Sequence, residues 1–207
     1  MDNKYFVLNI GRQLGSGGHD IGKMLAEHFQ IKFYDKELLD LAAQESGFDK
    51  HFFERDDEHR GFIKGFFYSI NPFSSSGNPY ENQLSSESLF KFQSEAIRKA
   101  ASQSSCVFVG RCADYVLRDY PRCINIFISA NMEDRVKRLS QKLNITEEEA
   151  EKRAVSGDEK RASYYNYYSA KTWGEAATYD LCINSSVLGL KETTEFIQNF
   201  VARKLDL

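Results

Sequence analysis

The sequence contains little cysteine, and its cysteines show no pairing pattern. None of the four belongs to a C-x-x-C pair, and they are Cys106, Cys112, Cys123 and Cys182. Zinc clusters require such pairs, and the disulfide frameworks of small secreted domains require a denser spacing. The sequence therefore indicates free thiols and no structural metal site, and it favours the cytosol.

The chain also lacks a large excess of either charge and any long apolar run. Its 27 basic and 30 acidic residues give a formal net charge of −3, which argues against general binding to nucleic acid or membrane surfaces. No apolar segment is long enough to span a bilayer, and the first residues do not have the layout of a signal peptide. We therefore expect one cytoplasmic domain with no internal repeat.

A glycine-rich stretch, KYFVLNIGRQLGSGGHDIG, follows the start of the chain. Residues 5–10 form an apolar run typical of a buried strand, and apolar residues return at helical spacing from Ile21 onward. Between them lie four glycines, Gly11, Gly15, Gly17 and Gly18. A strand, a glycine turn and a helix together aim backbone N–H groups at an anion, most often a phosphate.

The stretch fits neither of the two common phosphate-binding motifs completely. In the P-loop pattern G-x-x-x-x-G-K-[ST], Gly18 stands where the lysine belongs, His19 at the hydroxyl residue and Arg12 at the first glycine. In the dinucleotide pattern G-x-G-x-x-G, Asp20 replaces the third glycine, although Asp35 lies where a ribose-binding acid is expected. A third interpretation is a strand-to-helix connection that binds no ligand.

Four further short apolar runs alternate with helical patterns along the chain, at residues 31–34, 106–109, 124–128 and 181–184. This alternation predicts an α/β fold with a parallel sheet and right-handed crossovers. Arg111 follows the third strand directly, and ligands of open parallel sheets collect at the carboxyl ends of the strands. Its guanidinium suits phosphate or carboxylate, although a surface ion pair is the alternative.

Two segments lie outside this simple alternation. Residues 47–83 combine acidic, aromatic and turn-forming residues, which indicates a surface loop, a self-association patch or an inserted substrate-binding segment. A capping box at Thr146 and Glu149 opens a helix that ends in the tyrosine-rich sequence YYNYY at residues 164–168. Its tyrosines either stack on a nucleotide base or pack against the core.

Six pieces in register, spread over nearly the whole chain, resemble the cytidylate kinase-like branch of the P-loop nucleoside monophosphate kinases. They are IGRQLGSGGHDIG, IKFYDKELL, FVGRCADYVL, INIFISANMEDRVKRL, DEKRASYYNYY and YDLCINSSVLGL. The resemblance implies a three-layer P-loop NTPase fold with a five-stranded parallel sheet flanked by helices. It also implies one domain over residues 1–207, with a monophosphate-binding insertion at 47–83 and a closing lid at 153–173.

The same resemblance implies transfer of the γ-phosphoryl group of ATP, with Mg²⁺, to a nucleoside monophosphate such as CMP or dCMP. Small nucleotides would then be the partners, and a homodimer is possible. The donor phosphates would lie against Gly15, Ser16, Gly17, Gly18 and His19. The acceptor would lie against Asp35, Arg111, Asp114 and Arg153. The catalytic residues would be Arg12, Asp158 and Arg161.

Three positions depart from the family pattern. The lysine of the loop is Gly18, the aspartate of the G-R-D signature is Cys112, and an arginine before that strand is Ser86. Arg12 is the nearest cation that can replace the lysine, unless it pairs with Asp35 to brace the loop. A catalytically silent nucleotide-binding module and a kinase for another small acceptor therefore remain alternatives.

Overall fold

The computed structural model describes residues 5–35 and 79–207. Contacts divide the chain into two compact units, Met1–Asp35 with Arg98–Leu207, and Lys36–Ile97. Helix α5 (Pro79–Gln103) spans the boundary between the units. Most of the predicted insertion at 47–83 lies outside the described residues, so its role stays a prediction.

The first unit is built on five parallel strands in the order β2-β3-β1-β4-β5. They are β1 (Val7–Arg12), β2 (Lys32–Tyr34), β3 (Cys106–Val109), β4 (Cys123–Ser129) and β5 (Leu181–Asn184). The central strand β1 is covered on both faces, which explains its nearly continuous apolar sequence. The five-stranded parallel sheet predicted from the sequence is confirmed.

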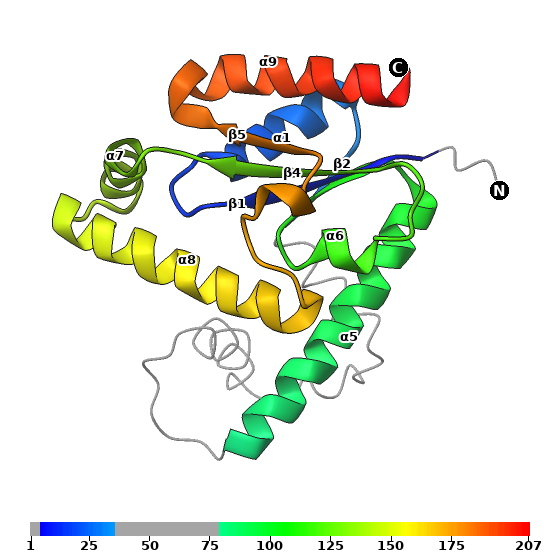
Figure 1. The fold of residues 1–207 in the computed structure, drawn as a ribbon, viewed down its shortest axis with the longest axis horizontal. Helices are drawn as coiled ribbons and strands as arrows, with labels where there is room; N and C mark the ends of the chain where they lie inside the picture. Colours follow the sequence, from blue (N-terminus) through cyan, green and yellow to red (C-terminus); the bar gives the residue numbers. More distant parts are fainter. Residues whose placement is uncertain (1–4, 36–78) are drawn as a thin grey trace, which may run out of the picture. The chain divides into compact units, whose positions relative to one another are not determined.

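Helices cover both faces of this sheet, as Figure 1 shows. One face carries α1 (Gly18–Phe29) and α9 (Ser185–Leu205), and the other carries α6 (Ala113–Val116) and α8 (Glu147–Ser169). Helix α7 (Met132–Leu143) packs against α8, and a 3₁₀ turn, η1 (Ala176–Thr178), precedes β5. None of the helices in the described ranges is both long and apolar enough to cross a bilayer.

The main hydrophobic core lies between the sheet and the pair α1 and α9. Leu8 and Ile10 of β1 are fully buried there against Ile21 and Leu25 of α1 and Ile197 of α9. This packing fixes the start of α1 directly beyond the carboxyl end of the central strand. The glycine-rich stretch is therefore held at the edge of the sheet where ligands of parallel α/β folds bind.

Candidate functional site

The glycine loop, residues 13–17, joins the end of β1 to the first residue of α1. Gly15 and Gly17 have φ angles of 82° and 78°, in the left-handed region that favours glycine. A β-carbon on Gly15 would lie 2.8 Å from the carbonyl oxygen of Arg135, and one on Gly17 would collide with Leu190. Both glycines are required by backbone conformation and by space.

The carbonyl groups of the loop are all engaged by the protein. Each one from residue 12 to residue 17 accepts a hydrogen bond, at distances of 2.7–3.3 Å. In chain order, the donors are Arg161 Nη1, Ser16 N and Oγ, Arg135 Nε, Arg138 Nη1, Ser185 Oγ and Ile21 N. The negative ends of the loop's peptide dipoles are therefore turned towards the protein.

Several N–H groups of the same loop have no partner. Within the described residues, no acceptor faces the backbone N–H of Gly15, Gly17, His19 or Asp20. All four groups lie in the loop or the first turn of α1, where the helix dipole also places partial positive charge. Free N–H groups combined with occupied carbonyls suit the loop to an anion such as phosphate.

Asp158 on α8 holds the loop in this form. Its Oδ1 accepts the N–H of Leu14 at 2.7 Å, and its Oδ2 accepts from Arg135 Nη2 at 2.5 Å. Arg135 is only 4% exposed and also donates to the carbonyls of Leu14 and Ala154. Because both carboxylate oxygens are engaged inside the protein, Asp158 is a positioning residue here rather than a group facing ligand.

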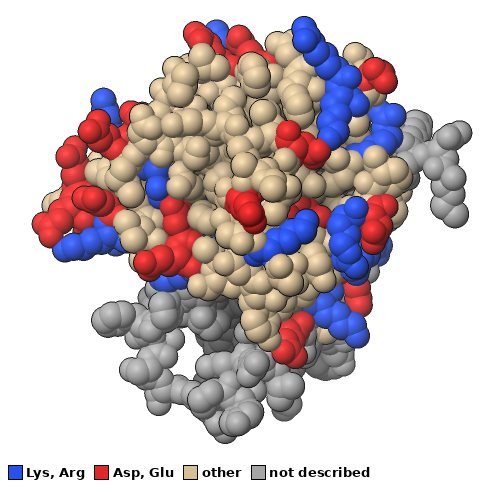
Figure 2. Space-filling view, viewed as in Figure 1, with Lys and Arg blue, Asp and Glu red and all other residues tan. Residues whose placement is uncertain are grey.

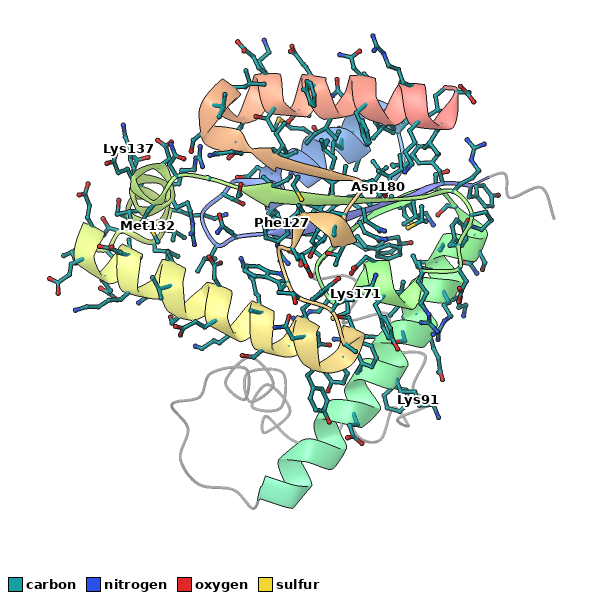
Figure 3. All side chains as sticks on the ribbon, in the orientation of Figure 1. Lys91, Phe127, Met132, Lys137, Lys171 and Asp180 are labelled. Atoms are coloured by element: carbon teal, nitrogen blue, oxygen red, sulfur yellow. The ribbon has the colours of Figure 1, made fainter. Side chains whose placement is uncertain are left out.

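Sequence reasoning assigned no role to Arg135 or to Arg138. They lie three residues apart on α7 and therefore on one face of the helix, which they turn towards the carbonyls of Leu14 and Gly15. Figure 3 shows Lys137 on the same helix pointing away from the loop. The spacing of three residues between Arg135 and Arg138 is the sequence signal for this shared role. Charged residues on an amphipathic helix more often face solvent, so the signal is weak.

Arg161 and Arg12 lie at the same end of the sheet as the loop. Arg161 donates through Nη1 to the carbonyl of Arg12 at 3.2 Å and lies 3.9 Å from Asp158. Burial lowers the pKa of Arg161, and the carboxylate of Asp158 opposes this shift. Burial and then the charge of Arg161 lower the pKa of Arg12 to about 9, so the guanidinium of Arg12 remains cationic at pH 7.

The turn after β3 brings Arg111 to the same place. Gly110, Arg111 and Cys112 have consecutive φ angles of 81°, 61° and 54°, and the last two belong to side chains that rarely adopt this region. The N–H of Gly110 donates to the carbonyl of Ile10 at 3.0 Å, which ties the turn to the central strand. Such strain is typical of functional sites. The turn places Arg111 just beyond the carboxyl end of β3, the neighbour of β1 in the sheet, and its acceptor role stays a prediction.

Other residues predicted for the site have different surroundings. Asp35 Oδ2 lies 3.2 Å from His19 Nε2 and makes no ion pair with Arg12, so the predicted brace between these two residues is absent from the described part of the chain. Ser16 turns its hydroxyl inward to the carbonyl of Gln13 at 2.9 Å. It supports the loop from behind instead of presenting its hydroxyl to a phosphate.

Asp114 and Arg153 are not gathered with the arginines. Asp114 is 8% exposed, and its Oδ2 accepts from the hydroxyl of Tyr165 at 2.6 Å. Burial raises the pKa of Asp114. Arg153 lies on the exposed side of α8 and pairs with Glu149 at 2.5 Å. The structure gives neither side chain a contact with the loop, so their acceptor roles stay predictions.

Some of the tyrosines at the end of α8 pack in the interior, and others are exposed. Tyr165 is 5% exposed and stacks towards Tyr179, with ring centroids 6.4 Å apart. Phe127 of β4, labelled in Figure 3, contacts Tyr179 and Trp173 on the same side of the sheet. These contacts favour the packing interpretation for Tyr165, because its ring is committed to the interior.

The surface seen in Figure 2 carries both signs of charge, with acidic side chains gathered where α8 begins. Within the described ranges, no three His, Cys, Asp or Glu side chains lie together as metal ligands would. All four cysteines are free thiols, as the sequence predicted. The positive groups of the site come instead from three separate elements, namely β1, the turn after β3, and α8.

The model of the cytidylate kinase-like family matches residues 7–187, a range that includes the loop, the turn at Arg111 and all of α8. The chain belongs to the cytidylate kinase-like family. The resemblance stated from the six sequence pieces is therefore confirmed. No curated protein matches the chain closely enough to add to this assignment.

Solved structures share the fold of this chain. An uncharacterized protein from Eubacterium ventriosum ATCC 27560 is 28% identical, covers 95% of this chain and 98% of its own, and superposes with a TM-score of 0.71. Shikimate kinase from Bacteroides thetaiotaomicron is 13% identical over 98% and 99% of the two chains, with a TM-score of 0.53. A gluconokinase from Sinorhizobium meliloti 1021 is 12% identical over 96% and 92%, with a TM-score of 0.54. The protein therefore has the three-layer P-loop kinase fold.

Proposed function

We propose that the protein is a phosphotransferase that moves the γ-phosphoryl group of ATP to a nucleoside monophosphate, with CMP and dCMP as the first acceptors to test. The observation that carries this proposal is the polarity of the glycine loop, whose carbonyls are all occupied and whose N–H groups at Gly15, Gly17, His19 and Asp20 are free among the described residues. Membership of the cytidylate kinase-like family supports the choice of donor and acceptor.

In this reaction, an oxygen of the acceptor attacks the γ-phosphorus, and the bond to the β–γ bridging oxygen breaks. ADP leaves with the bonding electron pair, and the acceptor's proton passes to solvent or to a nearby carboxylate. The chain supplies position and positive charge, which are the main requirements of phosphoryl transfer. The loop amides would hold the donor phosphates, while Arg111 and Arg161 would face the acceptor and the transferring group.

Magnesium is expected with ATP in this fold, and it neutralises phosphate charge when bound. The described residues do not fit a dedicated magnesium site. His19 stands where the P-loop pattern has a hydroxyl residue, and the hydroxyl of Ser16 is turned into the loop. Magnesium would therefore arrive as the complex with ATP, held by phosphate oxygens and water.

Two alternatives remain for the same loop. A catalytically silent nucleotide-binding module is favoured by Gly18, because the lysine that usually neutralises the β- and γ-phosphates is missing. A kinase for another small acceptor is favoured by the fold shared with shikimate kinase and gluconokinase. In each case we expect a cytosolic protein that acts on small molecules, as a monomer or a homodimer.

A coupled assay of ADP release tests the proposal. The purified chain is mixed with MgATP and, one at a time, CMP, dCMP, UMP, AMP, GMP, shikimate and gluconate. We expect turnover with a pyrimidine monophosphate, and we expect Arg111→Gln to lower kcat/KM for that acceptor more than tenfold. Arg118→Gln, a charge loss at an exposed site, is the matched control. Binding of MgATP without turnover for any acceptor would instead support the silent module.

A further inference from the structure

The side chain of Arg12 occupies the space in which a P-loop kinase carries its lysine. Gly18 stands at the lysine position and is the first residue of α1. A β-carbon on Gly18 would lie 2.5 Å from the β-carbon of Arg12 and 3.0 Å from its γ-carbon. Atoms in folded proteins do not pack so closely, so position 18 can carry no side chain while the stem of Arg12 is present.

A second glycine accommodates the other end of this side chain. A β-carbon on Gly110 would collide with Nη1 of Arg12, and Gly110 has a φ of +81°. Gly110 begins the strained turn that places Arg111 at the carboxyl end of β3. Arg12 therefore runs from β1 past the start of α1 to this turn, and its guanidinium lies where the loop meets the turn.

Among the side chains that the structure describes, none neutralises the guanidinium of Arg12. Across residues 5–35 and 90–207, it forms no hydrogen bond and no ion pair, and Asp35, whose charge raises the pKa of Arg12, is paired with His19. Arg161 and Arg111 add positive charge nearby. A partly buried cation without a partner destabilises the ligand-free protein, and an anion bound beside it would remove this cost.

We propose that Arg12 is the cationic ligand of the donor's β- and γ-phosphates and that it replaces the missing lysine by approaching them from the end of the central strand. This inference rests on the proposed function, because the anion concerned is the donor nucleotide of that reaction. The planar fork of an arginine suits two phosphate oxygens at once, which a lysine cannot match. The glycines at positions 18 and 110 leave the space for this side chain.

The variant Arg12→Met tests the inference. Calorimetric titration measures its affinity for MgATP, and thermal unfolding without ligand measures its stability. The variant keeps an apolar stem of similar length and removes the charge. We expect the Kd for MgATP to rise at least tenfold, while the ligand-free Tm is unchanged or higher because an unpaired cation has been removed. Arg203→Met, on the exposed last turn of α9, is the matched charge-loss control and leaves Kd within about twofold.

The second test moves the cationic side chain from position 12 to position 18. Gly18→Lys combined with Arg12→Gly frees the space at position 18 and is expected to recover most of the lost affinity. Gly18→Lys combined with Arg12→Ala is expected to recover little, because the β-carbon at position 12 remains 2.5 Å from the new one. Recovery in both pairs, or in neither, would overturn the inference.

The outcomes separate this inference from the proposed function. If the parent binds MgATP and Arg12→Met binds it equally well, Arg12 is not a phosphate ligand and only the inference is lost. If the ligand-free Tm of Arg12→Met is lower than that of the parent, Arg12 braces the loop, and the inference is again overturned. If the parent binds no MgATP, the proposed function itself is wrong and the inference is lost with it.

Discussion

At the scale of single residues, the proposed phosphate site depends on side chains that hold the loop from behind and do not face the ligand. Arg135 and Arg138 hold the carbonyls of Leu14 and Gly15, and Asp158 holds the N–H of Leu14. Each of these bonds turns one polar group of the loop into the protein. The remaining N–H groups are left for the ligand, so the affinity of the loop is set by contacts behind it.

Asp158→Asn is expected to lower the free energy of unfolding by about 3 kcal/mol, because Arg135 would be left as a buried charge without its carboxylate. An amide can still accept from Leu14, but its NH₂ group cannot pair with a guanidinium. Urea denaturation monitored by circular dichroism measures the change. Glu148→Gln breaks an exposed pair on the same helix and should cost less than about 1 kcal/mol. Equal losses in the two variants would contradict the positioning role.

Thiol reactivity gives an independent check on the packing. Burial raises the pKa of Cys106, Cys112 and Cys123 to about 12, so their thiolates are almost absent at pH 8, whereas Cys182 is exposed. We expect a chromogenic disulfide reagent to titrate one thiol in the native protein and four after denaturation. Cys182→Ser should remove the fast thiol. Fast reaction of two or more thiols in the native state would show that this packing is wrong.

Some of these residues could be read from the sequence and others could not. Arg111 could be placed because it lies two residues beyond an apolar run, and the end of a parallel strand is a known ligand position. Arg135 could not be placed, since its charge indicates a solvent-facing position, whereas the side chain is 4% exposed. Its partners come from two other elements, and no local pattern in the sequence brings them together.

At the scale of elements, boundaries were predictable where a local signal exists. The strands Cys106–Val109 and Leu181–Asn184 match their apolar runs to the residue, and α8 begins after Thr146, whose Oγ1 accepts from Glu149 N at 3.2 Å. The last helix, α9, begins at Ser185 and is broken at Gly189, where φ is 75°. The helical spacing of apolar residues from Leu190 onward would place its start five residues too late. Helix α6, four residues long, is too short to show a period.

Helix α8 is packed along its length in this structure. Ala150 and Ala154 pack with Leu139 of α7, Asp158 and Arg161 bind the glycine loop, and Tyr165 binds Asp114. The lid predicted for residues 153–173 therefore includes the half of α8 that is docked on the loop. Its swing on nucleotide binding stays a prediction.

Hydrogen exchange distinguishes a lid that is open without ligand from the docked α8 of this structure. Because α8 is held by side-chain bonds to two other elements, we expect the amides of residues 154–169 to exchange as slowly as those of α7 in the ligand-free protein. Mass spectrometry of the peptic peptides from the two helices compares them directly. Exchange of α8 at the rate of exposed loops, slowed by nucleotide, would favour a lid that is open without ligand.

At the scale of the whole molecule, the fold was the most predictable feature. Five apolar runs alternating with helical patterns imply a parallel sheet, and the six pieces in register imply its family. The central position of β1 in the sheet is implied by the family resemblance, because the strand's own sequence does not show which strands lie beside it. The route of Arg12 past Gly18 and Gly110 could not be predicted, because it depends on how two loops meet in space.

The most direct test of the account is a footprint of MgATP on the loop, measured by amide hydrogen exchange resolved to single residues by NMR. We expect the N–H groups of Gly15, Gly17, His19 and Asp20 to exchange at least tenfold more slowly with saturating MgATP, because each gains a phosphate acceptor. The same measurement with adenosine should leave them unchanged. Binding of MgATP that leaves these four amides unprotected, or no binding at all, would contradict the claim that this loop is the donor-phosphate site.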